Sequence, residues 1–221
     1  MIARELISST LPVLRCSDLG KKAVNMMESL RVSHLPLVRD QEYLGLISDK
    51  DVYDLEMEMC HIGETGATFP TPFVRVNQHI YEVVQKLKEF EVSVLPVLEM
   101  NNQYFGAIIV SELSKSFVKL VAVNDPGAVI VLEIIPVHYS LSQIAQIVES
   151  NDAKVLSLYT YMPEDRNEME VTLKVNVTDI SSIIETFVRY DYAIKAVFMD
   201  DSLLNHMYTE RYDLFMKYMN L

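Results

Sequence analysis

The first half of this chain contains one sequence pattern twice. Residues 17–38 (SDLGKKAVNMMESLRVSHLPLV) align with residues 77–98 (NQHIYEVVQKLKEFEVSVLPVL) at a shift of 60 positions. One extra residue in the following turn changes the shift to 61, so that Gly45 aligns with Gly106. A solenoid usually needs three or more repeats. Two copies of this length instead predict a pair of supersecondary units that bury their apolar faces against each other.

Composition and charge exclude several classes of protein. Half of the 221 residues are apolar, which is enough for a proper core and is not typical of a disordered chain. The net charge of −12 argues against a nucleic-acid surface and against binding to an anionic membrane. The apolar runs are too short to cross a bilayer as helices, and the N-terminal residues lack the apolar region of a signal peptide. The two cysteines make no disulfide framework, so we expect reduced thiols in a cytoplasmic protein.

Each copy is predicted to run strand, helix, strand, strand, helix. In copy one, apolar residues at helical spacing predict a helix that follows an N-cap at Ser17 or Asp18 and ends at Leu30. In copy two, the same spacing predicts a helix at residues 78–90. Short apolar runs around a polar turn predict a hairpin in each copy. In copy one, we expect a leading strand at residues 11–14, hairpin strands at 35–38 and 43–47, and a closing helix at 49–57. In copy two, we expect a leading strand at residues 72–76, hairpin strands at 95–98 and 104–110, and a closing helix at 111–121.

The order of elements, the S-x-L-P step and the G-x-x-S-x-x-D ending resemble a CBS-domain pair, also called a Bateman module, over residues 1–122. We therefore expect CBS domain 1 at residues 1–60 and CBS domain 2 at residues 61–122. The resemblance implies a regulatory module that binds an adenine nucleotide or an adenosyl compound in the clefts between the copies. It also implies that a Ser or Thr and an acidic residue three positions later hold the ribose.

Copy one carries the G-x-x-S-x-x-D ending from Gly45 to Asp51 without change. Ser48 lies at the predicted junction between a strand and a helix. Asp51 in the first helical turn is able to accept hydrogen bonds from both hydroxyls of a ribose. The helix N-terminus suits a phosphate, with Lys50 and Arg15 as counter-charges. The alternative is that Ser48 only caps the helix and Asp51 is only a favourable first-turn acid.

Copy two departs from this pattern, because Ile109 replaces the hydroxyl residue and Glu112 replaces the aspartate. Ile109 cannot bond to a ribose, whereas Glu112 could still reach one, so we expect at most one well-formed site per chain. In copy one the resemblance also places His34, whose counterpart is Val94, beside the base pocket, although a histidine among apolar neighbours is more often structural. The pocket lining implied by the family layout is Leu11, Val13, Leu35 and Pro36.

The second half follows a linker at residues 122–128 and has the strand-helix-strand-strand-helix-strand order of a ferredoxin-like unit. This order resembles an ACT domain over residues 128–199. The stretch 136–141 contains no glycine at the turn where amino-acid-binding ACT domains usually have one, so a dimerising domain is favoured over an amino-acid sensor. Residues 200–221 are predicted to form a helix that packs on its own chain or contacts a subunit or partner.

The complete interpretation is an α+β chain with a tandem CBS-domain pair and a C-terminal ferredoxin-like, ACT-like domain, an order that resembles bacterial proteins of the acetoin-utilisation B type. We expect a regulatory protein without a cofactor that binds AMP, ADP, ATP or S-adenosylmethionine, forms a homodimer and regulates another protein.

Other functions stay open at this point. The chief alternative is an oligomerisation or adaptor protein with vestigial nucleotide clefts. No catalytic motif of a hydrolase, metalloprotease, P-loop protein or dinucleotide enzyme occurs, so an enzyme is disfavoured. The adjacent Cys60 and His61 supply two potential ligands, which do not make a metal site.

Overall fold

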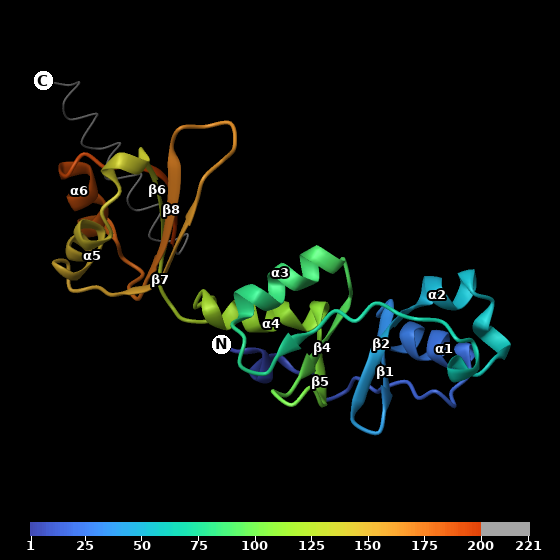
Figure 1. Cartoon of the computed structure of the whole chain (residues 1–221). Helices are drawn as coiled ribbons and strands as arrows, with labels where there is room; N and C mark the ends of the chain where they lie inside the picture. Colours follow the sequence, from blue (N-terminus) through green and yellow to red (C-terminus); the bar gives the residue numbers. More distant parts are fainter. Residues whose placement is uncertain (200–221) are drawn as a thin grey trace, which may run out of the picture. The chain divides into compact units, whose positions relative to one another are not determined.

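The computed structural model of this protein describes residues 1–199 and divides the chain into two compact units, one of residues 1–116 and one that begins at Phe117. Figure 1 labels most of the helices and strands of both units. The helix predicted at 200–221 lies outside the described residues. Within the described part, no helix combines the length and apolar character that crossing a membrane requires.

Copy one contains helix α1 (Gly20–Leu30), the hairpin of β1 (His34–Arg39) and β2 (Glu42–Ser48), and the short helix α2 (Asp49–Asp54). Ala23, Val24 and Met27 of α1 are buried, and α1 ends where Arg31 adopts the left-handed conformation that commonly terminates helices. The 3-10 turns η2 (Met57–Met59) and η3 (Ile62–Glu64) follow α2.

Copy two repeats these elements as α3 (Ile80–Phe90), β4 (Val94–Leu98), β5 (Tyr104–Ile109) and α4 (Val110–Leu120). The two hairpins share even their irregularity. The register shifts between Leu37 and Val38 in copy one and between Val97 and Leu98 in copy two, which are equivalent positions. The predicted repeat is confirmed at the level of strand register.

The predictions for the leading strands and for the first helix cap were partly wrong. Of the strand predicted at 11–14, only Leu14 pairs, with Leu37, and the strand predicted at 72–76 is reduced to β3 (Val74–Arg75). Pro12 and Pro72 interrupt these segments, because proline has no N–H for a strand ladder. The N-cap of α1 is Leu19, without a side-chain bond. The carboxylate of Asp18 instead accepts from Lys22 and from the N–H of Arg15.

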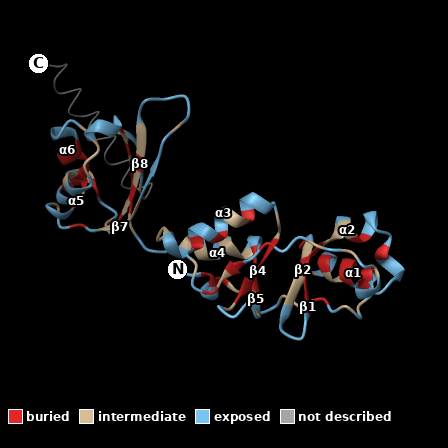
Figure 2. Ribbon diagram, in the orientation of Figure 1, coloured by how far each residue is buried: buried red, intermediate tan, exposed pale blue. Residues whose placement is uncertain are grey.

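One hydrophobic core joins the two copies. The cluster built on copy one also contains Val94, Ala107 and Ile109 of copy two, as predicted for units that bury their faces against each other. Beside it, the Tyr104 N–H donates to the Gln41 carbonyl at 2.8 Å, and the rings of Tyr43 and Tyr104 lie 6.5 Å apart. Figure 2 shows buried residues concentrated on the strands and on the inner sides of the helices.

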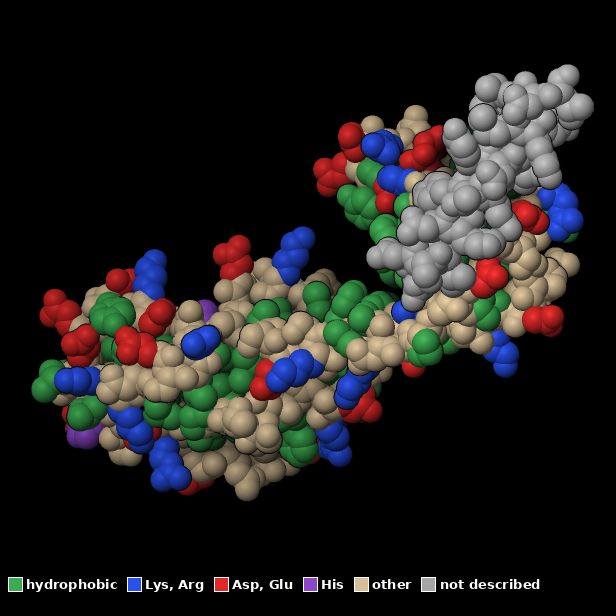
Figure 3. Space-filling model, turned by 180° about the vertical axis from the view of Figure 1, so that it is seen from behind, with side chains coloured by type: hydrophobic (Ala, Val, Ile, Leu, Met, Phe, Trp, Pro, Cys, Tyr) green, Lys and Arg blue, Asp and Glu red, His purple; other side chains and the backbone are tan. Residues whose placement is uncertain are grey.

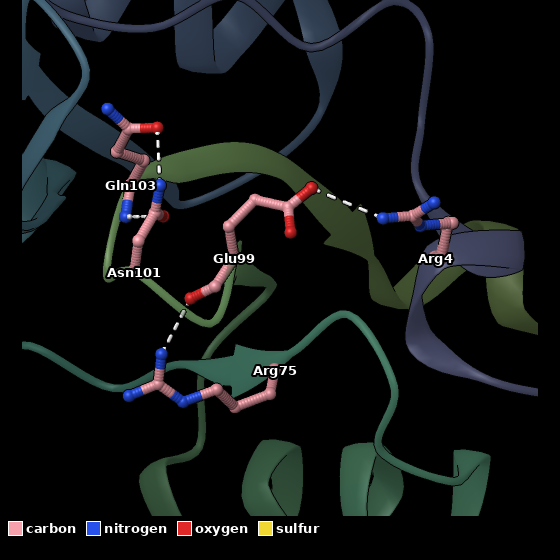
Figure 4. Close-up of polar contacts among 5 residues, drawn as sticks. All are labelled: Arg4, Arg75, Glu99, Asn101 and Gln103. Atoms are coloured by element: carbon pink, nitrogen blue, oxygen red, sulfur yellow. Dashed lines mark hydrogen bonds and ion pairs between the residues drawn. The ribbon is translucent and has the colours of Figure 1, made fainter.

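The first residues of the chain pack against copy two rather than copy one. The 3-10 turn η1 (Ala3–Leu6) places Ala3 and Leu6 in a second core cluster with the strands of copy two. Arg4 bonds to the Glu99 carboxylate at 3.2 Å, and Arg75 donates to the Glu99 carbonyl at 2.6 Å (Figure 4). These two arginines hold the β4–β5 turn from two other segments of the chain.

The second unit confirms the predicted order of strands and helices. Its elements are β6 (Val129–Ile134), the 3-10 turn η4 (Pro136–His138), α5 (Leu141–Glu149), β7 (Val155–Tyr161), β8 (Met169–Val175), α6 (Ser181–Arg189) and β9 (Ala193–Phe198). The strands form one antiparallel sheet in the order β7-β8-β6-β9. Alternate residues of β6 and β8 are buried and form one core with α5 and α6. The N-cap of α6 is Ile180, and the Asp179 carboxylate accepts two bonds from Ser181.

Gly127 yields the first prediction, because its backbone has φ of +147° and a Cβ there would lie 1.9 Å from the carbonyl oxygen of Val175. Gly127→Ala should therefore destabilise the second unit by at least about 2 kcal/mol, from strain and overpacking together. The matched control is Gly66→Ala in the first unit, where φ is +62° and no atom lies within 4 Å, so only about 1 kcal/mol is expected. Hydrogen exchange resolved by peptide measures both, and equal effects of the two changes would contradict the prediction.

Candidate ligand-binding site

Ser48 and Asp51 bond to each other at the junction of β2 and α2. The Ser48 hydroxyl accepts from the Asp51 N–H at 3.0 Å and donates to Asp51 Oδ2 at 2.7 Å, while the same Oδ2 accepts from the Ser48 N–H at 2.8 Å. This is a reciprocal cap of the helix. Within the described residues Asp51 Oδ1 makes no hydrogen bond, so one carboxylate oxygen is available to a hydroxyl of a ligand.

His34 lies opposite Ser48 across the β1–β2 ladder, so the fold brings three of the predicted residues together. Its Nδ1 lies 3.1 Å from the Ser93 hydroxyl, and the Ser93 N–H donates to the same nitrogen at 3.3 Å. Burial lowers the pKa of the His34 imidazole below its ordinary value of 6.5, although the carboxylates of Asp49 and Asp51 act in the opposite direction. The ring is therefore held neutral near neutral pH.

Ser93 is a site residue that the sequence reasoning missed. It is the repeat equivalent of Ser33, and the alignment of the two copies recorded it only as a match. A serine at the aligned positions 33 and 93 of the two copies was the feature of the sequence that could have pointed to it. What the alignment did not reveal is that Ser93 points across the boundary to the ring of His34 and to the N–H of Ser33.

The other predicted residues are placed as follows. Arg15 and Lys50 are exposed, and within residues 1–199 neither side chain makes a hydrogen bond or ion pair. Glu112 is half-buried in the first turn of α4. Their roles as counter-charges or ligand contacts stay predictions.

The apolar lining is divided between core and partly open positions. Leu35 is 0% exposed and Pro36 is buried, so the side chains of these two residues serve the core in this structure. Leu11 and Val13 are half-buried, and Leu11 packs against the edge of the shared core. Ser33 and Asp49, the neighbours of His34 and Ser48, line a hollow of about 250 Å³. That volume is slightly below the range usual for small-molecule sites.

The equivalent junction of copy two is apolar on both strands. Ile109 pairs with Val94 as Ser48 pairs with His34, and Ile109 is only 6% exposed. Ile109 also belongs to the core that joins the copies. Ile109, which stands where copy one has the Ser48 hydroxyl, thus contributes to the packing between the two copies.

Neither cysteine is bonded, and across residues 1–199 no cluster of three or more His, Cys, Asp or Glu side chains is arranged to hold a metal ion.

A family model for the CBS domain matches residues 3–58. Residues 3–58 are a CBS domain. This match covers copy one and the β1–β2–α2 junction with Ser48 and Asp51. Copy two has the same elements but lies beyond the matched residues.

A homoserine O-acetyltransferase of Methanobrevibacter ruminantium is 24% identical over 114 residues, which cover 51% of this chain. The chain spans about a quarter of the length of that curated relative, 23%. Among solved structures, a putative acetoin utilization protein from Vibrio cholerae is 18% identical, with 56% of this chain and 95% of the other covered at a TM-score of 0.48. A structure of CBSX2 in complex with AMP is also 18% identical, with 53% and 96% covered at a TM-score of 0.45.

The lowered pKa of His34 yields the second prediction. Between the folded-state value and 6.5, the unfolded chain binds more protons at this residue than the folded chain. The contribution of His34 to the free energy of unfolding is therefore complete above pH 6.5 and declines as the pH falls toward the folded-state pKa. His34→Gln removes this dependence, so the wild-type protein should lose stability relative to the variant on acidification. Urea unfolding at a series of pH values measures the difference, and a difference that does not change with pH would contradict the assignment.

Proposed function

We propose that this chain is a regulatory protein whose CBS domain binds an adenine nucleotide or an adenosyl compound at the Ser48–Asp51 junction. The observation that carries the proposal is the convergence of Ser48, Asp51 and His34 at that junction inside residues matched by the CBS family model. The ribose hydroxyls would donate to Asp51, whose Oδ1 is available, and the Ser48 hydroxyl would turn from Asp51 to the ligand.

The charges around this junction favour a ligand of low negative charge. Asp49 and Asp51 both lie in the first turn of α2, and α2 is only six residues long. Two carboxylates there oppose a phosphate more than a short helix attracts one. Arg15 and Lys50 remain the proposed counter-charges. AMP or an adenosyl group is therefore preferred over ATP.

The alternative function is oligomerisation or adaptor binding with vestigial clefts. Two observations favour it: Ser48 and Asp51 already satisfy each other as a helix cap, and the neighbouring hollow is small. Thermal-shift measurements with AMP, ADP, ATP and S-adenosylmethionine distinguish the two functions, because a ligand that binds only the folded state raises the unfolding temperature. The acetyltransferase activity of the longer relative is not proposed, since the chain spans only 23% of that protein.

Asp51→Asn tests the ribose contact. The amide oxygen is able to replace Oδ2 as acceptor from the Ser48 N–H, while the charge that a ribose diol would bond is lost. AMP affinity should fall by roughly 1.5–3 kcal/mol, the range for a hydrogen bond to a charged group. The matched control is Ser140→Ala, which removes the cap bond to the Gln143 N–H of α5 and should leave affinity unchanged. Isothermal calorimetry measures both, and undiminished binding by Asp51→Asn rejects the site.

The two copies should bind unequally, because Ile109 and Val94 replace Ser48 and His34 in copy two. Titration should give about one site per chain. The double change Ile109→Ser and Glu112→Asp restores the copy-one motif, but it also removes a buried side chain from the shared core at a cost of about 2–4 kcal/mol. Two equal sites in the wild-type chain, counted by calorimetry, would show that Glu112 and the backbone suffice.

We also propose that the protein is a homodimer and that a regulated protein partner contacts it. Tyr81 and Val84 lie three residues apart on α3 and are 77% and 51% exposed, so they share one apolar face of that helix. Figure 3 shows apolar side chains between charged ones on the first unit. A closed two-fold pair is the commonest way to bury such surfaces. Light scattering should report a dimer at micromolar concentration, and Tyr81→Glu should favour the monomer; a monomeric wild type contradicts this proposal.

A further inference from the structure

The bond between His34 and Ser93 crosses from one copy to the other. His34 begins β1, opposite Ser48, whereas Ser93 immediately precedes β4 of copy two. Two contacts converge on Nδ1 of the imidazole: the Ser93 hydroxyl at 3.1 Å and the Ser93 N–H at 3.3 Å. Across the described residues, Nε2 of the same ring makes no hydrogen bond.

The direction of these bonds follows from their donors. The Ser33 N–H donates to the Ser93 oxygen at 2.9 Å, so that oxygen already acts as an acceptor and its hydrogen is free to be donated. The Ser93 N–H can only donate. Nδ1 therefore receives two donors and must be without a proton. In a neutral imidazole the proton then resides on Nε2.

We propose that Ser93 is a positioning residue that fixes His34 as the Nε2–H tautomer, so that copy two determines which hydrogen-bonding group copy one offers to its ligand. This inference rests on the proposed function for the ligand contact, but the tautomer itself does not depend on any ligand. His34 then presents a neutral N–H donor beside Ser48 and Asp51. The group it selects is an uncharged acceptor, such as a ring nitrogen of a purine.

The arrangement is one-sided. The position equivalent to His34 is Val94, which is fully buried, and the Ser33 hydroxyl makes no hydrogen bond within the described part of the chain. Ser33 contributes only its N–H, which orients the Ser93 hydroxyl. The aligned residues Ser33 and Ser93 therefore make different contacts, and only copy one contains an imidazole, that of His34, which a serine orients.

The charged groups that act on the ring come from one element. Asp49 and Asp51 of α2 attract a proton toward it, while β1, β2 and the start of β4 contribute no charged residue that shifts it. Protonation of Nδ1 would place a donor opposite the Ser93 N–H, so that contact would be lost, and the Ser93 hydroxyl would have to change from donor to acceptor. The Nε2–H tautomer and the contact from the Ser93 N–H thus depend on each other.

Nitrogen-15 NMR of the imidazole in the full-length protein without ligand tests the tautomer. At neutral pH, His34 should show a protonated Nε2 and an unprotonated Nδ1 in the wild type and in the control Ser33→Ala. Ser93→Ala should increase the Nδ1–H form several-fold, because only the longer N–H contact remains. A charged ring or an Nδ1–H ring in the wild type would overturn the inference, as would identical spectra of Ser93→Ala and Ser33→Ala.

A second measurement tests the ligand contact. His34→Gln keeps an N–H donor near the position of Nε2, whereas His34→Phe keeps ring volume and removes the donor. AMP affinity should fall roughly ten-fold in His34→Phe and by less than about two-fold in His34→Gln, as one neutral hydrogen bond predicts. Equal affinities of these two variants would remove the ligand role of His34. If the wild type binds none of the four adenosine compounds, the proposed function fails while the NMR result still decides the tautomer.

Discussion

The shared core between the two copies is the constraint on which the first unit depends. Each hairpin is short, and a small isolated unit of this kind buries too little apolar surface to be stable alone. Val94, Ala107 and Ile109 of copy two complete the cluster built by copy one, and Tyr43 and Tyr104 pack together at the adjoining edge. Burial also raises the pKa of both tyrosines above the ordinary value, so their hydroxyls remain neutral within the joint.

The shared core between the two copies also makes their strand-to-helix junctions unequal. At the strand-to-helix junction, copy one keeps a polar set of Ser48, Asp51 and His34, whereas copy two has the apolar pair Val94 and Ile109. A buried hydroxyl or imidazole needs partners, which copy one finds in its own helix cap and in Ser93. The apolar side chains of Val94 and Ile109 in copy two need no hydrogen-bond partners, and both belong to the shared core. Equivalent positions thus carry a polar cluster in copy one and core packing in copy two.

The second unit depends on a different constraint. Its sheet alternates buried and partly exposed residues along β6 and β8, so one face forms the core with α5 and α6. Gly127 permits the chain to pass against the carbonyl of Val175 as it enters β6. The ACT-like nature of this unit remains a prediction, since element order and sheet order alone define a ferredoxin-like arrangement that serves many functions.

The sequence by itself determined the repeat, the order of the elements and the two hairpins, because periodicity and turn residues are local properties of the chain. Helix and strand positions were therefore predicted to within a few residues, apart from the segments that Pro12 and Pro72 interrupt. The sequence also named Ser48 and Asp51 as a pair and, through the family resemblance, His34. Only the tertiary structure decided that these three meet, that Leu35 faces the core, and that Ser93 reaches His34 across 59 positions of sequence. Contacts between distant segments depend on how the two copies pack, and a local pattern carries no record of that packing.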